Sequence, residues 1–235
     1  MGDTLYNLLV KEYTEKQWGR KCTELPPSII KRLVIRNTYN NNYFNHPYQG
    51  VPYIGWKQVF ENMLKGIEVK LNEKPTLDEL KKFDCPIIFT GPIDELYDYQ
   101  FGKLDYLKIR YEEKTFNTDN YQGVAVINHI DKTTPWTRSI EHNFFNPKYV
   151  SKTIISFEYF DEKADITAYP IRDKKNEELY NKYLTIIDKN IIPAGRLGLY
   201  RYLNMDDTVA AAMELWIEKF SAQGDYWKET EKFHL

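Results

Sequence analysis

A short run near the N-terminus combines the residue types that bind a nucleoside diphosphate. Residues 13–18 read Tyr-Thr-Glu-Lys-Gln-Trp, Arg32 follows fourteen residues later, and residues 42–44 read Asn-Tyr-Phe. Aromatic rings can stack on a base, and a guanidinium can hold phosphate oxygens in pairs. The run therefore predicts a nucleotide diphosphate site, with candidate contacts at Tyr13, Thr14, Trp18, Arg32 and Tyr43.

A second candidate is the glycine-containing stretch 195–206, which reads Gly-Arg-Leu-Gly-Leu-Tyr-Arg-Tyr-Leu-Asn-Met-Asp. It leads into a predicted helix over 206–220 that is rich in alanine. Unpaired backbone N–H groups and the positive end of the helix dipole suit a phosphate or flavin oxygen. On the residues alone, glycines before a helix are more often turn residues.

Three further polar residues lie in the sheet-like middle of the chain. Tyr169 belongs to Ala-Tyr-Pro-Ile-Arg at 168–172, Asn128 lies on a predicted strand, and Arg138 precedes Glu141 and His142. The Tyr-Pro pair is explained as well by a strand end closed by proline. A guanidinium at position 138 would suit a diphosphate better than lysine, because its planar fork matches phosphate oxygens.

Composition excludes several classes of function. The formal net charge is −2, and Lys and Arg are interspersed with Asp and Glu, so no basic face predicts a nucleic-acid partner. The four histidines have no ligand spacing, so no metal site is expected. Cys22 and Cys85 are predicted to be free thiols. Without a secretion signal or an apolar run of about 20 residues, the chain is predicted to be soluble, cytoplasmic and not membrane-bound. Asp94, Glu95 and Asp98 are interpreted as a solvated helix face.

The apolar periodicity predicts an α+β fold. Alternation over 106–111, 123–130, 137–144 and 153–157 indicates an antiparallel sheet of about six strands. Further strands are predicted at 67–71 and 191–192, with a buried apolar strand at 85–89. Helices are predicted over residues 3–18, 55–64, 76–82, 176–187 and 206–220.

The motifs, in this order and spacing, resemble the UDP-galactopyranose mutase family, flavin-dependent isomerases of nucleotide sugars. The likeness extends from Gly2 to about Trp216. It implies that Arg32 and Arg138 are catalytic and grip the substrate diphosphate from opposite sides. The implied substrate contacts are Tyr13, Thr14, Trp18, Tyr43, Asn128, Tyr169 and Tyr202, and the implied flavin contacts are Gly195, Arg196, Asn204, Met205 and Asp206.

One further likeness and three departures from the family pattern accompany these roles. Glu158 resembles a glutamate near the family's sugar pocket. Asn204 stands where the family usually has Asp, and Leu107 where it has Arg. An aromatic pair expected before Tyr13 is Leu-Val at 9–10, which weakens one wall of the uracil pocket.

The resemblance also implies an activity: interconversion of UDP-galactopyranose and UDP-galactofuranose for cell-surface polysaccharide synthesis. In the family, N5 of reduced FAD attacks the anomeric carbon, UDP leaves, and the sugar ring reopens and contracts. The flavoproteins' Gly-x-Gly-x-x-Gly turn does not occur in these residues. We therefore expect a truncated, inactive C-terminal part that does not bind FAD alone.

The resemblance divides the chain into four expected segments. These are part of a helical substrate-capping domain at 1–51, a return segment of the FAD-binding domain at 52–103, an antiparallel sheet domain at 104–171, and the C-terminal part of the FAD-binding domain at 172–235. A non-catalytic nucleotide-sugar-binding module, or one subunit of a split enzyme with a separate flavin-binding chain, is the alternative. A homodimer is left open.

Overall fold

The fold is α+β, as predicted, in a computed structural model that describes residues 2–25, 38–40, 42, 44–145 and 151–221. The chain divides into two compact units. Unit 1 comprises residues 1–73 and 107–168, and unit 2 comprises residues 74–106 and 169–235.

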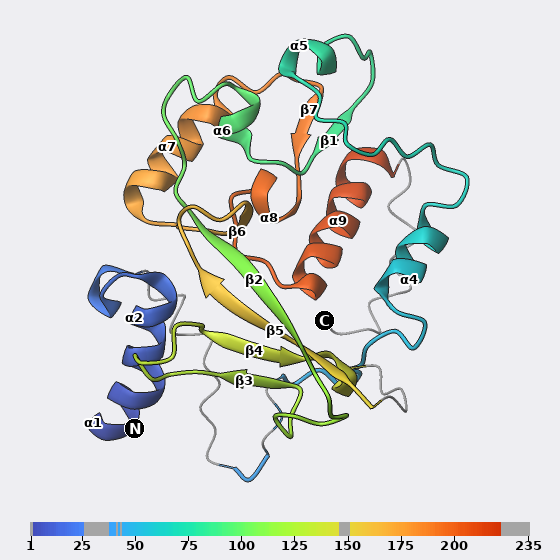
Figure 1. Cartoon of the computed structure of the whole chain (residues 1–235). Helices are drawn as coiled ribbons and strands as arrows, with labels where there is room; N and C mark the ends of the chain where they lie inside the picture. Colours follow the sequence, from blue (N-terminus) through green and yellow to red (C-terminus); the bar gives the residue numbers. More distant parts are fainter. Residues whose placement is uncertain (1, 26–37, 41, 43, 146–150, 222–235) are drawn as a thin grey trace. The chain divides into compact units, whose positions relative to one another are not determined.

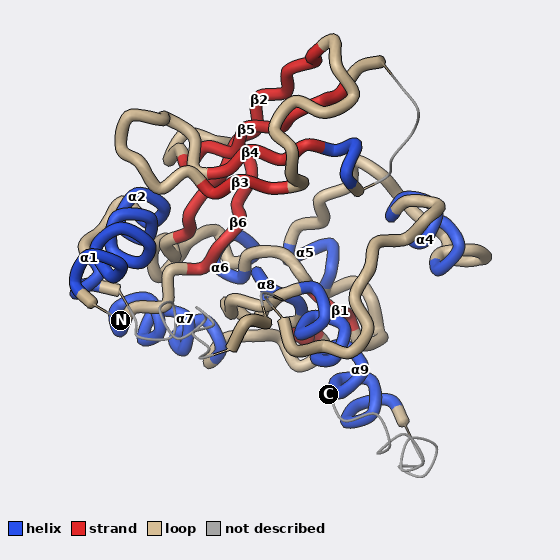
Figure 2. The backbone as a smooth tube through the Cα atoms, turned by 90° about the horizontal axis from the view of Figure 1, so that it is seen from below, coloured by secondary structure: helices blue, strands red, loops and turns tan. Residues whose placement is uncertain are grey.

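A five-stranded sheet with the order β3-β4-β5-β2-β6 confirms the predicted antiparallel pairing within the described chain. Figure 2 shows its strands as one twisted layer. β5 lies in the middle of the sheet and is mostly buried, although its sequence TIISFEYF includes the polar residues Thr153, Ser156 and Glu158. The strands are β2 (Tyr106–Phe116), β3 (Val126–Asn128), β4 (Arg138–Glu141), β5 (Thr153–Phe160) and β6 (Ile166–Pro170).

The predicted N-terminal helix is confirmed as one helical run at the start of unit 1. It comprises α1 (Asp3–Leu5), a π-helical segment (Tyr6–Glu12) and α2 (Tyr13–Trp18). Gly19 ends the run with a φ of 61°, a left-handed conformation that favours glycine. Unit 1 also contains α4 (Trp56–Met63) and two 3-10 turns at Cys22–Glu24 and His142–Phe144.

The secondary structure of unit 2 is built around two parallel strands, β1 (Ile87–Phe89) and β7 (Ile191–Pro193). Its helices are α5 (Leu77–Leu80), α6 (Ile93–Leu96), α7 (Lys174–Leu184), α8 (Gly195–Gly198) and α9 (Met205–Phe220). Buried side chains from these elements and from the segments that join them form its core: Leu80, Ile93, Leu96, Tyr97, Leu104, Tyr183, Ile191 and Tyr200.

Three details of the sequence interpretation are wrong. Residues 67–71 form no strand: their apolar side chains are exposed, and no neighbouring strand pairs with them in the described chain. β1 is not fully buried, because Ile88 is 51% exposed. Asp94 is not on a solvated face but is buried, where it accepts the Leu104 N–H at 2.9 Å. Burial raises the pKa of its carboxyl group.

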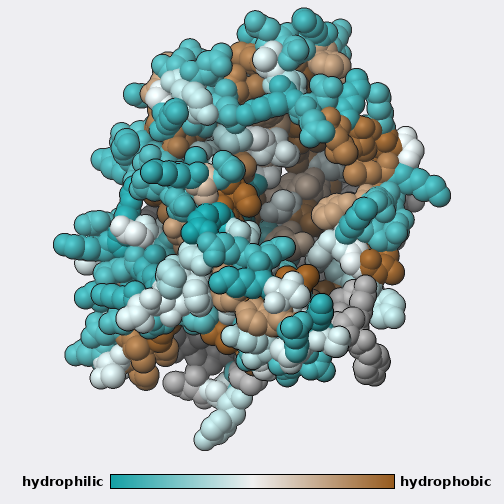
Figure 3. Space-filling model, in the orientation of Figure 1, coloured by the Kyte–Doolittle hydropathy of each residue, from teal (hydrophilic) through white to brown (hydrophobic). Residues whose placement is uncertain are grey.

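Apolar side chains also reach the surface of each unit, and Figure 3 shows hydrophobic patches in brown among the polar atoms. In unit 1 they include Tyr53, Trp56, Phe60 and Met63 on and beside α4, and in unit 2 Met205, Val209, Met213 and Trp216 along α9. None of the helices in the described ranges is long and apolar enough to span a bilayer. Both cysteines are free thiols, as predicted.

Candidate functional site

In unit 1, four side chains form a row across four neighbouring strands. Asn128 of β3 lies opposite Arg138 of β4, Arg138 lies opposite Glu158 of β5, and Glu158 lies opposite Tyr111 of β2. Directly opposed residues in an antiparallel sheet point to the same face. The strand register therefore gathers an amide, a guanidinium, a carboxylate and a phenol on one face.

A hydrogen bond from Tyr13 joins this row to the N-terminal helix. Asn128 Oδ1 accepts the Tyr13 hydroxyl at 3.2 Å and Arg138 Nε at 3.3 Å. Tyr13 is half-buried, Asn128 is exposed, and the Arg138 side chain is 30% exposed. Three residues that the sequence analysis proposed for the site are thus brought together, although they lie up to 125 positions apart in the chain.

Glu158 is the buried acid at the other side of Arg138. Its carboxylate accepts the Tyr111 hydroxyl at 3.1 Å and Thr137 Oγ1 at 3.3 Å, and lies 3.7 Å from Arg138 Nη1. Because the carboxylate is almost fully buried, the neighbouring positive charge and the hydroxyl donors offset its desolvation. The sequence analysis named Glu158 from its resemblance to a family glutamate, and it predicted neither the pairing with Arg138 nor a role for Tyr111.

The remaining residues of the first motif are placed differently. Thr14 and Trp18 are buried on α2, so a base could reach the Trp18 ring only after neighbouring side chains move. Arg32 and Tyr43 lie outside the described residues. Of the two rings at 13–18, Tyr13 is therefore the one with partly exposed surface, and Phe44 of the same motif is 44% exposed.

In unit 2, a second cluster combines two phenols and a guanidinium. The rings of Tyr169 and Tyr202 are stacked, with centroids 5.1 Å apart and an interplanar angle of 9°. The Arg196 guanidinium carbon lies 5.1 Å from each ring centroid, within reach of a cation–π interaction. A positive charge beside two hydroxyl groups suits a phosphorylated ligand.

Tyr200, which the sequence analysis did not propose, fixes the backbone that carries this cluster. Its buried hydroxyl contacts Asp105 O at 2.7 Å and Ile171 O at 2.9 Å. Burial raises the pKa of this phenol, so it stays neutral and able to donate. Tyr200 therefore links the segment that carries Tyr169 to the one that carries Tyr202.

The stretch 195–206 carries polar groups on α8, on the loop after it and on the first turn of α9. Arg196 donates from Nε to Leu203 O at 3.0 Å, which fixes the loop between α8 and α9. The first turn of α9 carries exposed Met205 and Asp206, and the amide of Met205 has no acceptor within the helix.

Gly195 and Gly198 have backbone reasons to be glycine. Gly195 has a φ of 68°, and a Cβ on Gly198 would lie 2.5 Å from Phe89 O. Both glycines lie in α8 and not in a turn before a helix: the positive φ of Gly195 and the close approach of Gly198 to β1 explain them. A ligand role for this stretch stays a prediction.

No metal site accompanies these clusters: the described residues contain no group of three or more His, Cys, Asp or Glu side chains placed to bind an ion. The chemistry of the two clusters is that of holding an anionic, hydroxyl-bearing ligand. The fold and these side chains define the class: an α+β protein with groups suited to a phosphorylated ligand.

Comparison with known proteins defines the family. The sequence model of UDP-galactopyranose mutase matches residues 8–202, and the chain belongs to this family. It is 38% identical over 91% of its length to a probable UDP-galactopyranose mutase of Klebsiella pneumoniae and 37% identical to a dTDP-fucopyranose mutase of Escherichia coli. It spans 57% and 60% of these two relatives.

A solved structure supports the fold. The crystal structure of a reduced UDP-galactopyranose mutase aligns with 95% of this chain and 67% of its own, with a TM-score of 0.65 and 12% identity. At that identity the likeness concerns the fold alone.

Proposed function

We propose that this chain supplies nucleotide-sugar-binding and flavin-contacting residues of an isomerase that interconverts UDP-galactopyranose and UDP-galactofuranose. Membership of the family supports an isomerase. The observation that carries the proposal for this chain is the row Asn128–Arg138–Glu158 on one sheet face, with Tyr13 of α2 hydrogen-bonded to Asn128. It brings an aromatic residue beside an oriented guanidinium.

Arg138 is the residue we propose to stabilise the leaving diphosphate. Asn128 and Glu158 orient its guanidinium from two sides, and its side chain keeps a 30% exposure through which a ligand can reach it. A preorganised charge stabilises developing negative charge without reorganising during the reaction. For Arg32 the resemblance implies a second clamp, and that role stays a prediction.

In unit 2, Tyr169 and Tyr202 are proposed to donate their hydroxyl groups to phosphate oxygens. Their stacked rings and the neighbouring Arg196 restrict the positions of both phenols. Restricting a side chain before binding lowers the entropy that binding costs. Asn128, with its amide at the exposed end of β3, is proposed to contact the sugar hydroxyls.

A flavin is the proposed cofactor, contacted in this chain by Gly195, Arg196, Asn204, Met205 and Asp206. When bound, it supplies the nucleophilic nitrogen that replaces UDP at the anomeric carbon. Asp207 accepts the Asn204 N–H at 3.0 Å and so holds the first turn of α9 in place. Asn204 itself brings no charge to this turn, whereas the family's Asp would.

Nucleotide binding tests the substrate. We expect isothermal titration of the purified chain to detect UDP binding, and Arg138→Met to weaken it, because a positive charge facing phosphate is lost. Arg110→Met, on strand β2 of the same sheet, is the matched control. Tighter binding of dTDP than of UDP would assign this chain the substrate class named for the Escherichia coli relative. Binding of neither would contradict the proposal.

Flavin binding requires a separate measurement. We expect the purified chain to be colourless and to take up little FAD, because the Gly-x-Gly-x-x-Gly turn that binds the pyrophosphate is not among its residues. Excess FAD is added and unbound FAD is removed by gel filtration. Absorption in the flavin band, at roughly 350–500 nm, then measures uptake. A stoichiometric yellow complex would show that the residues of unit 2 suffice to hold the cofactor.

A further inference from the structure

Lys16 joins the N-terminal helix to the loop that follows β3. Its ammonium donates to His129 O and to Asp131 O, at 2.8 Å each, across 113 and 115 residues of sequence. Figures 1 and 2 both show α2 beside the end of β3. Both partners belong to unit 1. No ligand contact is needed to explain these two bonds.

The loop that receives Lys16 has its own internal support. Asp131 Oδ1 accepts the Thr134 N–H at 2.7 Å and the Thr133 hydroxyl at 2.6 Å. These bonds lower the pKa of the Asp131 carboxyl group, so it stays ionised. The carbonyl groups that accept from Lys16 are therefore presented by a loop that is already ordered.

The contact is polar and partly shielded from water. Desolvation lowers the pKa of Lys16, and the negative charge of Asp131 opposes this shift. Hydrogen bonds from a charged donor are stronger than those between neutral groups. The bond from the Tyr13 hydroxyl to Asn128, at 3.2 Å, is the neutral and longer contact between the same two segments.

Sequence spacing connects the two contacts. Tyr13 and Lys16 are three residues apart on α2, so their side chains are neighbours on the helix surface. Their partners, Asn128 and His129, are consecutive residues. The stronger contact at Lys16 therefore fixes the position of the helix turn from which Tyr13 reaches Asn128.

We propose that Lys16 is a positioning residue for nucleotide binding: it fixes α2 against the loop after β3 and thereby holds Tyr13 beside Asn128 and Arg138. The inference rests on the proposed function, because it assigns Tyr13 to the nucleotide site. Lys16 acts through Tyr13 and touches no ligand.

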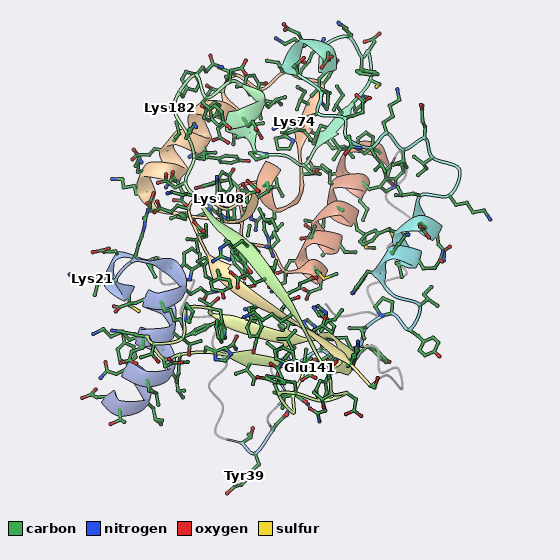
Figure 4. The ribbon with its side chains drawn as sticks, viewed as in Figure 1. Lys21, Tyr39, Lys74, Lys108, Glu141 and Lys182 are labelled. Carbon is green, nitrogen blue, oxygen red and sulfur yellow. The ribbon has the colours of Figure 1, made fainter. Side chains whose placement is uncertain are left out.

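The test compares Lys16→Met with Lys21→Met. The control removes the same charge from an exposed lysine five residues away, which Figure 4 labels on the outer side of this region. We expect Lys16→Met to raise the Kd for UDP about tenfold or more, the scale of a lost charged hydrogen bond. The control should leave the Kd within about twofold, as surface substitutions usually do.

A double-mutant cycle separates positioning from general destabilisation. If Lys16 acts through Tyr13, then Lys16→Met should weaken UDP binding much less in a Tyr13→Ala background, which lacks the ring, than in the wild-type chain. Additive effects of the two substitutions would overturn the positioning role. If Lys16→Met does not fold, as judged by circular dichroism, Lys16→Gln takes its place, because it keeps a polar end at the same position.

Two failures are distinguishable. A wild-type chain that binds neither UDP nor dTDP overturns the proposed function and the role of Lys16 with it. A wild-type chain that binds UDP, together with a Lys16→Met variant of equal affinity, overturns the positioning role alone. Faster hydrogen exchange of residues 13–18 in Lys16→Met, and not in Lys21→Met, is expected alongside the loss of affinity.

Discussion

Replacing Arg138 by alanine should lower the stability of the chain by about 3 kcal/mol, a large effect for one side chain on a sheet. The reason is Glu158, which would remain buried without its neighbouring positive charge. The hydroxyl groups of Tyr111 and Thr137 would still donate to the Glu158 carboxylate. The loss of stability should therefore lie near the lower end of the range for breaking a buried ion pair. Urea unfolding followed by circular dichroism measures the loss.

The double variant Arg138→Ala/Glu158→Gln separates stability from catalysis. Removing the buried charge should restore most of the lost stability, because a neutral amide no longer requires a counter-charge. Turnover should stay low, because the proposed diphosphate clamp is still missing. The expected loss of transition-state stabilisation, relative to wild type, is roughly 2–4 kcal/mol. Turnover is measured in a preparation that interconverts the two UDP-sugars, with product ratios read by chromatography.

Arg110→Ala is the matched control for this pair. Arg110 lies on β2 of the same sheet and contacts Glu112 and Asp161, but its side chain is 41% exposed. Exposed ion pairs contribute about 1 kcal/mol or less, so the control should change stability little. Equal losses of stability in Arg110→Ala and Arg138→Ala would contradict the explanation that the buried Glu158 carboxylate makes Arg138 more important. Near-normal turnover in the double variant would contradict the clamp.

The sequence was sufficient to predict elements whose pattern depends on local interactions. The helical run 3–18 ends at Gly19 because a left-handed residue must follow, and α9 begins within one residue of its predicted start. Strand alternation also gave the antiparallel sheet. It did not give the register, and the register is what places Asn128, Arg138 and Glu158 opposite one another.

The sequence-based predictions fail where contacts between separate segments of the chain decide the structure. Residues 67–71 alternate like a strand, yet a strand needs a neighbour with which to form hydrogen bonds, and alternation alone does not supply one. Asp94 looked exposed because two other acids lie close to it in sequence. Its burial follows from the Leu104 N–H, a backbone donor ten residues later that no side-chain pattern reveals.

The same limit applies to the site. The resemblance named Tyr13 and Asn128 as separate substrate contacts, and the hydrogen bond between them was not predicted. Lys16 stood inside the quoted motif without a role, because its acceptors are backbone carbonyl groups more than a hundred residues away. Side-chain types can be read from a sequence, whereas backbone acceptors presented by a folded loop cannot.

Replacing Gly198 by alanine should be among the most destabilising single-methyl additions in unit 2. The new Cβ would lie 2.5 Å from Phe89 O, far inside van der Waals contact, and the atom it meets is backbone, so no side chain can rotate away. Phe89 O also accepts the Ala194 N–H at 2.9 Å, and moving it would disturb the end of β1. Overpacking of this kind costs about 1–3 kcal/mol or more.

Two other glycines serve as controls for this effect. Gly195→Ala adds a Cβ 3.5 Å from Thr90, an ordinary contact, and should cost about 1–2 kcal/mol from its φ of 68°. Gly50→Ala meets no atom within 4 Å and should change stability by less than about 0.5 kcal/mol. The urea midpoint should therefore be highest for Gly50→Ala, intermediate for Gly195→Ala and lowest for Gly198→Ala. If Gly198→Ala is as stable as Gly50→Ala, then α8 is not held against β1 as closely as the structure indicates, and the placement of Arg196 on α8 fails with it.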